Sequence, residues 1–71
     1  MCGVYYLTDG LDVLYVGASR NVEARIRQHA RNIDFSQVFV DQCEADQLPV
    51  MEAKAIREFR PPLNEANTTI R

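Results

Sequence analysis

Apolar and polar positions divide the start of the chain into two β-prone segments. Residues 3–8 and 12–17 are rich in Val, Tyr and Leu. The Asp9-Gly10 dipeptide between them is a strong turn signal. This pattern predicts a β-hairpin.

The register of this hairpin decides where its tyrosines lie. A loop with an odd number of residues, centred on Gly10, would place Tyr5 directly opposite Tyr15, with both rings on one face. A two-residue loop at Asp9-Gly10 would instead pair Tyr5 with Leu14, and a slip of one residue sends side chains to opposite faces. We expect the odd loop.

A helix is predicted after the hairpin. Gly17-Ala18-Ser19 is expected to end the second strand, and Ser19 or Asn21 can cap a helix that extends to about Asn32. Four apolar residues recur at helical spacing and are expected to form its buried stripe: Val22, Ile26, Ala30 and Ile33.

Two polar side chains flank this predicted stripe. Arg25 and His29 are four residues apart and are therefore neighbours on the helix surface. At ~100° per residue both lie at the edge of the apolar stripe, where they can face sideways into a cleft.

The second half of the chain predicts a strand and a second helix. Residues 35–40 alternate imperfectly and are β-prone. Asp46 is the expected cap of a helix with Pro49 in its first turn, ending near Phe59. Arg60-Pro61-Pro62 terminates this helix because proline cannot extend the hydrogen-bond ladder.

The predicted order is ββαβα with a short tail from Leu63 to Arg71, so the fold class is α/β in the α+β sense. We expect residues 1–71 to form a single domain of marginal stability, because chains of this length bury only ~60% of their unfolded surface.

Composition indicates a folded and soluble protein, with 46% apolar and 25% charged residues. The sequence contains no apolar run of the ~20 residues that a membrane span needs and no signal peptide, so a cytoplasmic location is expected, without a membrane partner. Cys2 and Cys43 have no metal-binding or CxxC spacing, and we expect two reduced thiols.

The net charge of −2 disfavours a protein that binds nucleic acid over its whole surface. One short stretch is nevertheless basic, opposed only by Glu23. It is either a solvated helix face or a local patch that faces phosphate. Its members are Arg20, Arg25, Arg27 and Arg31.

An acidic residue interrupts the apolar stripe of the second predicted helix, which consists of Leu48, Met51, Ala55, Ile56 and Phe59. Glu52 projects between Phe59 and Ile56. A carboxylate there is costly unless it is paired or bound to a cation. It is either a structural ion pair or a functional acid, since perturbed acids gather at active sites without being confined to them.

These features together resemble a known family. Gly-Val-Tyr at 3–5, Tyr-Val-Gly at 15–17, Arg-Ile-Arg-Gln-His at 25–29, a helical glutamate at 52 and Pro-Pro-Leu-Asn at 61–64 are similar to the GIY-YIG nuclease domain. Both tripeptides have Val where the family name has Ile. The resemblance extends from Gly3 to about Asn64.

The resemblance implies a small three-stranded antiparallel sheet flanked by helices and an endonuclease that hydrolyses phosphodiester bonds in DNA with one divalent cation, Mg²⁺ or Mn²⁺. Gly3 and Gly17 match glycines that let backbone pass close to the site. The implied catalytic residues are Tyr5, Tyr15, Arg25, His29, Glu52 and Asn64, with Glu52 as the metal ligand.

The chemistry of these side chains suits that reaction. Glu52 offers a hard oxygen ligand for Mg²⁺, and Arg25 a planar donor set for phosphate. We expect Tyr5 to be the general base, with Tyr15 sharing or orienting the water and His29 accepting the phenol proton. Asn64 would hold the end of the chain or orient a ligand.

The sequence departs from the family pattern at Ala18, where some relatives have a lysine, so any contact from that lysine is missing. Nothing here resembles the separate DNA-binding domain that relatives commonly carry. The domain could act alone, as a homodimer or within a larger nuclease assembly. The alternatives are a non-catalytic or weakly active module that binds nucleic acid or protein on the same fold, and a purely structural network of Glu52 and the tyrosines.

Overall fold

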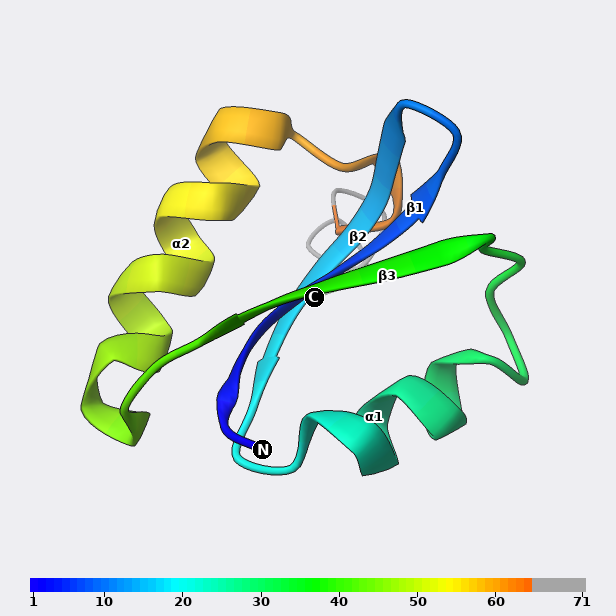
Figure 1. The fold of residues 1–71 in the computed structure, drawn as a ribbon. Coiled ribbons are helices and arrows are strands. Elements are labelled where there is room, and N and C mark those ends of the chain that lie inside the picture. The colour runs from blue at the N-terminus through cyan, green and yellow to red at the C-terminus, as the bar shows by residue number, and fades with distance from the viewer. Residues whose placement is uncertain (65–71) are drawn as a thin grey trace.

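The computed structural model describes residues 1–64. Three strands and two helices follow one another in the predicted order ββαβα, with one short 3₁₀ helix before the last element (Figure 1). The predicted α+β class is therefore confirmed. The elements are β1 (Gly3–Asp9), β2 (Asp12–Ser19), α1 (Val22–His29), β3 (Gln37–Gln42), η1 (Ala45–Gln47) and α2 (Leu48–Phe59).

The sheet is antiparallel and has the strand order β2-β1-β3, so β1 is central and β2 lies at one edge. The two helices cover opposite faces (Figure 1). Alternation along β1 divides its side chains between these faces. Val4 packs with Ala55 in the α2 layer, whereas Tyr5 and Leu7 pack with Val22 in the α1 layer.

The hairpin register differs from both sequence expectations. Tyr5 pairs with Gly17, and Tyr15 pairs with Leu7, so the predicted direct pairing of the two tyrosines is wrong. The turn has two residues, because Asp9 pairs with Asp12, and its Gly10 has a φ of 62°. Glycine enters this left-handed region without the steric cost that a Cβ brings.

A β-bulge accounts for the new register. Thr8 pairs with Val13 and Leu7 with Tyr15, which leaves Leu14 as an extra residue in β2. A bulge shifts every later side chain of its strand by one position. Tyr15 is thereby placed on the same face as Tyr5, as expected, although the two rings are diagonal rather than opposite neighbours.

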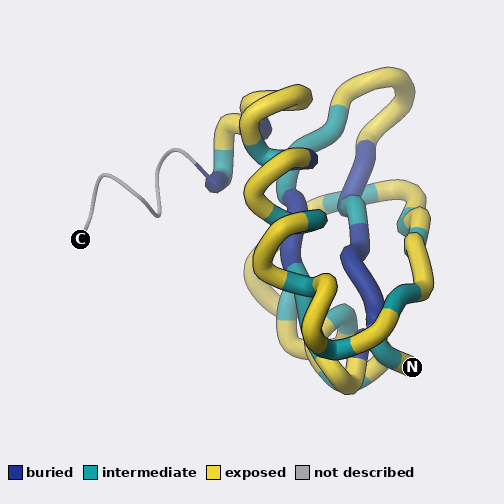
Figure 2. Tube along the Cα trace, turned by 90° about the vertical axis from the view of Figure 1, so that its left-hand side faces the viewer, coloured by how far each residue is buried: buried dark blue, intermediate teal, exposed yellow. Residues whose placement is uncertain are grey.

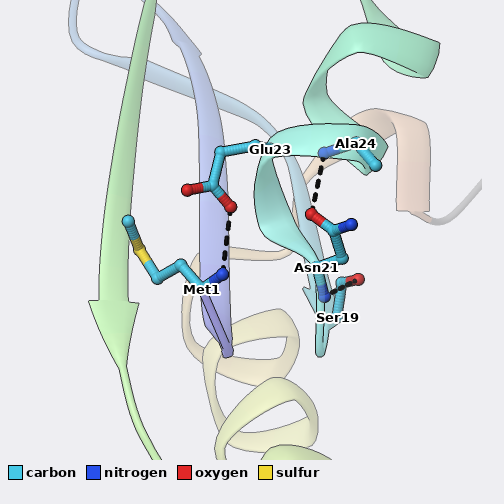
Figure 3. A network of polar contacts seen from close by, with 5 residues as sticks. All are labelled: Met1, Ser19, Asn21, Glu23 and Ala24. Carbon is cyan, nitrogen blue, oxygen red and sulfur yellow. Dashed lines mark hydrogen bonds and ion pairs between the residues drawn. The ribbon is translucent and has the colours of Figure 1, made fainter.

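Helix α1 begins with a well-formed cap. The Asn21 side chain accepts a hydrogen bond from the Ala24 N–H, and the Ser19 hydroxyl accepts one from the Asn21 N–H (Figure 3). Both expected capping residues therefore contribute at this end. Glu23 accepts a bond from the amino group of Met1 at 3.1 Å in the same network.

Several element boundaries correct the sequence expectations. Strand β2 continues through Ser19 instead of ending at Gly17 because each of its last residues still pairs with β1. Helix α1 ends at His29 rather than Asn32 because turn-type bonds replace the helical ladder, such as Arg31 N–H to the Gln28 carbonyl. The third strand occupies 37–42 rather than 35–40.

The entry to α2 also differs. Asp46 lies inside η1 and does not cap α2, whose preceding residue is Gln47. The Gln47 side chain accepts the Glu44 N–H at 3.1 Å and so closes the 3₁₀ turn. Pro49 lies in the first turn of α2 as predicted.

The exit of α2 follows the prediction. Arg60 ends the helix in a left-handed conformation with a φ of 47°, and its N–H donates to the Ile56 carbonyl. Pro61 next to it is buried. Residues 62–64 are helical, so the predicted tail begins with helical residues at Leu63 and Asn64, and its remainder lies outside the described residues.

Burial is concentrated on β1 and on the second half of β2, whereas β3 has no buried residue and most helix residues are exposed or half-buried (Figure 2). Two members of the predicted stripes depart from this pattern. Ala30 is exposed because α1 ends one residue before it. Phe59 is 48% exposed, with its ring edge against Tyr6 at 5.8 Å between centroids.

Candidate active site

Three aromatic side chains from β1, β2 and α1 form a cluster on the α1 face of the sheet. The ring centroids of Tyr15 and His29 are 4.7 Å apart, those of Tyr5 and His29 5.6 Å, and those of the two tyrosines 6.2 Å. The Tyr5 hydroxyl forms a 2.8 Å hydrogen bond with Nε2 of His29. Three of the predicted site residues therefore meet at one point.

The Tyr5 ring fits into this cluster because its cross-strand partner is a glycine. A Cβ on Gly17 would collide with Cζ and the hydroxyl oxygen of Tyr5 and would lie 2.9 Å from Cε1. Tyr5 is 0% exposed, so it has no free space into which to move. Gly17 thus gives the ring its place on the sheet.

Gly3 makes a similar approach between backbones. Its Cβ would meet the carbonyl group of Asp41 on β3 and lie 3.2 Å from the α carbon of Gln42. Only a residue without a side chain lets β1 and β3 come this close. Both glycines of the tripeptides are therefore required by close contacts.

The electrostatics of Tyr5 combine opposing influences. Burial raises the pKa of Tyr5 to about 12, and the nearby Tyr15 and Glu52 contribute to the rise. The charge of Arg25 and a hydrogen bond from it oppose this rise in pKa. Arg25 on α1 therefore lowers the pKa of Tyr5, whereas Glu52 on α2 raises it.

His29 is held in its neutral form. Burial lowers the pKa of His29, and the positive charge of Arg25 lowers it further. A neutral imidazole has one nitrogen that can accept a proton. If the phenol of Tyr5 donates, Nε2 is this acceptor and the proton of the ring is on Nδ1.

The four arginines of the predicted basic patch are all exposed. Arg25 and Arg27 lie on α1, and the other two lie on the segments that flank this helix. Arg25 differs from the others in its contact with Tyr5. Arg25 is thus the member of the patch that links α1 to the aromatic cluster. The patch consists of Arg20, Arg25, Arg27 and Arg31.

Glu52 is half-buried on α2, as its place in the apolar stripe predicts. Within residues 1–64 no three His, Cys, Asp or Glu side chains gather as a preformed metal cage. A single carboxylate still fits Mg²⁺, because this ion commonly takes one or two protein oxygens and completes its octahedron with water and phosphate. A single carboxylate is thus compatible with a hydrated divalent cation, whereas a structural zinc takes four protein ligands.

Asn64 binds the backbone of β2. Its Oδ1 accepts the Val16 N–H at 2.7 Å, and its Nδ2 donates to the Val16 carbonyl at 2.8 Å. Asn64 is 8% exposed. One side chain thus satisfies both outward-facing backbone groups of Val16, the residue between Tyr15 and Gly17.

Sequence reasoning missed one residue that positions the site. Leu14 is the extra residue of the bulge, and without it Tyr15 would point to the α2 face. No periodicity in residues 12–17 signals a bulge, because an inserted residue in a short apolar run leaves the alternation ambiguous.

Within the described part of the chain, no helix is both long and apolar enough to cross a bilayer.

No solved structure matches the chain. UvrABC system protein C of Wolbachia sp. subsp. Brugia malayi (strain TRS) is 32% identical over 77 residues, which cover 89% of this chain and 12% of that protein. The chain thus spans about an eighth of this relative's length. A family model of the GIY-YIG catalytic domain matches residues 1–52, and the chain therefore belongs to the GIY-YIG nuclease family.

Proposed function

We propose that this domain is a divalent-metal-dependent endonuclease that hydrolyses phosphodiester bonds in DNA. The observation that supports it most is the 2.8 Å hydrogen bond between the Tyr5 hydroxyl and His29 Nε2. The charges of Arg25 and Glu52 also affect the pKa of Tyr5. A proton acceptor, a phosphate-binding cation and a hard metal ligand are the groups that phosphodiester hydrolysis needs.

Proton removal from the attacking water is assigned to the pair of Tyr5 and His29. As the phenol oxygen takes a proton from water, the phenol proton passes along the hydrogen bond to Nε2 of His29. No free tyrosinate forms, so the raised pKa of Tyr5 does not block this route. The lowered pKa of His29 keeps the accepting nitrogen available at neutral pH.

Arg25 binds the scissile phosphate in this proposal. In the free protein the guanidinium of Arg25 lowers the pKa of Tyr5 through its charge and a hydrogen bond. Tyr5 is completely buried. When the guanidinium turns to the phosphate, the lone pair of the phenol oxygen becomes available to water. A planar guanidinium can contact two phosphate oxygens at once, which an ammonium group cannot do.

The remaining residues position these groups. Tyr15 packs on the imidazole and shares or orients the water. Asn64 fixes Val16 and with it the β2 segment that carries Tyr15. Glu52 is the ligand for Mg²⁺, which when bound would stabilise negative charge on the phosphate and the leaving oxygen. The exposed Arg20, together with Arg27 and Arg31, would contact neighbouring phosphates.

A plasmid-nicking assay tests this function. We expect conversion of supercoiled plasmid to nicked or linear forms with Mg²⁺, and none with EDTA. Glu52→Gln should abolish cleavage with the fold intact, whereas Glu58→Gln, an exposed carboxylate on the same helix, should retain it. Equal activity of the two variants would exclude Glu52 as the metal ligand.

The second candidate is a non-catalytic module that binds nucleic acid or protein. The complete burial of Tyr5 favours it, because a phenol that water never reaches cannot take part in hydrolysis. The discriminating result is retention of a DNA oligonucleotide by the domain, with a strong salt dependence, in the absence of any cleavage at high protein concentration.

A further inference from the structure

Cys2 and Cys43 are 41 positions apart in the sequence and are neighbours in the fold. Gly3 pairs with Gln42 at the end of the β1·β3 ladder, and the ladder continues by one step, since the Cys43 N–H donates to the Cys2 carbonyl at 3.1 Å. Side chains directly opposite one another in an antiparallel pair lie on the same face. The two thiols therefore share one side of the sheet.

The surroundings of the two thiols are consistent with this placement. Both side chains line the same surface hollow of ≈ 350 Å³, together with Gln42, Glu44 and Gln47. Both are free and partly exposed, so that a small reagent can reach them. Gly3, which brings the two strands unusually close, is the next residue along β1.

We propose that Cys2 and Cys43 are a redox modification site that forms a reversible intramolecular disulfide. Residues directly opposite in an antiparallel pair have α carbons ~4.5 to 5.5 Å apart, within the ~4.4 to 6.8 Å range of disulfides. A metal site is the weaker reading, because no third ligand joins them among residues 1–64.

The oxidant is a low-molecular-weight disulfide. The Cys2 thiolate attacks one of its sulfurs, a mixed disulfide forms, and one small thiol leaves. The Cys43 thiolate then attacks the Cys2 sulfur, the protein disulfide forms, and the second small thiol leaves. Two cysteine protons end on the two released thiols, and the protein loses two electrons that reduce the small disulfide.

The order of attack follows from the surroundings of Cys43. Burial raises the pKa of Cys43, and Cys2 and the acidic residues nearby contribute further, beginning with Glu44. Less thiolate is then present on Cys43 at neutral pH than on an ordinary cysteine, so the second step is assigned to Cys43. The bond would join the start of β1 to the segment that leads into η1 and α2, the helix that carries Glu52.

The test uses the full chain, reduced and then incubated at low concentration with oxidised glutathione. We expect the intact mass to fall by two hydrogen atoms, no thiol to remain for alkylation, and the Tm to rise by ~10 °C or more, because the bond closes a long loop. Reduction should reverse all three changes.

Cys2→Ser and Cys43→Ser are the matched controls, and each should stop at a glutathione adduct on its remaining cysteine, without the rise in Tm. The proposal is overturned if the wild-type chain accumulates two glutathione adducts or a disulfide-linked dimer. It is also overturned if the oxidised chain melts at the temperature of the reduced one.

Discussion

Substitution of Gly17 by alanine tests how the aromatic cluster is built. A Cβ at this position would lie 2.9 Å from Cε1 of Tyr5 and closer still to Cζ and the hydroxyl oxygen, whereas ordinary contact begins at 3.4 Å. The Tyr5 ring must therefore move by at least half an ångström. Because Tyr5 is 0% exposed, any such movement pushes against packed neighbours or opens the hydrogen bond to His29.

The magnitude follows from these two costs. Overpacking of a filled core costs ~1 to 3 kcal/mol, and loss of the bond between Tyr5 and His29 costs ~1 kcal/mol more. For a domain of this size each kcal/mol lowers the Tm by ~4 to 8 °C. We expect Gly17→Ala to melt roughly 10 °C or more below the wild type, as measured by thermal unfolding followed by circular dichroism.

The matched control is Gly10→Asn in the turn. A Cβ at Gly10 meets nothing within 4 Å, and asparagine tolerates the positive φ of 62° at this position. A spectrophotometric titration adds an independent readout, since a displaced Tyr5 should ionise closer to pH 10 than to its native value of about 12. If Gly17→Ala melts and titrates as the wild type does, our account of why glycine is required there is incorrect.

Three further outcomes are expected. Arg25→Lys should reduce cleavage by at least ~10-fold with unchanged folding, while Arg27→Lys should have little effect, in plasmid-nicking time courses. Asn64→Ala leaves the buried N–H and carbonyl of Val16 unsatisfied and should lower the free energy of unfolding by ~2 to 4 kcal/mol in urea titrations. Because the folded pKa of His29 is below 6.5, the unfolded chain binds a proton first as the pH falls. Stability should thus decrease from about pH 6.5 down to the folded pKa, and a His29→Gln variant should remove this decrease; a flat wild-type profile would contradict the lowered pKa.

Local patterns in the sequence predicted the elements well because each depends on neighbouring residues. The apolar spacing of 48–59 and the Arg60-Pro61 stop needed no tertiary information, and α2 occupies that range. The register of the hairpin could not be predicted, since it depends on an extra residue at Leu14 whose effect appears only when β1 and β2 pair. Asp46 is a strong capping residue by type, but the 3₁₀ turn closed by Gln47 moved the start of the helix past it.

The candidate site was predictable to a different degree. Tyr5, Tyr15 and His29 come together as expected, because a hairpin and the helix that follows it are close neighbours in almost any packing of this order. The contact between Cys2 and Cys43 was not foreseen, since it requires knowing that β3 pairs with β1 rather than with β2. Spacing along the chain carries no information on that choice.

Charged groups from the helices on both faces of the sheet affect the pKa of Tyr5. Helix α1 packs on the face of Tyr5, and α2 packs on the face of Val4, yet the charges of Arg25 and Glu52 both affect Tyr5. The Tyr5 ring extends from the central strand β1 over Gly17 of the edge strand β2, where a Cβ would collide with Cζ and the hydroxyl oxygen. At Gly17 the edge strand therefore has no side chain beside this hydroxyl. A bulky residue at position 17 should therefore displace the ring and weaken the influence of Glu52 on the pKa of Tyr5. Charge removal by Glu52→Gln should lower the pKa of Tyr5 in the wild type. The same substitution should lower it less in a chain that has a bulky residue at position 17.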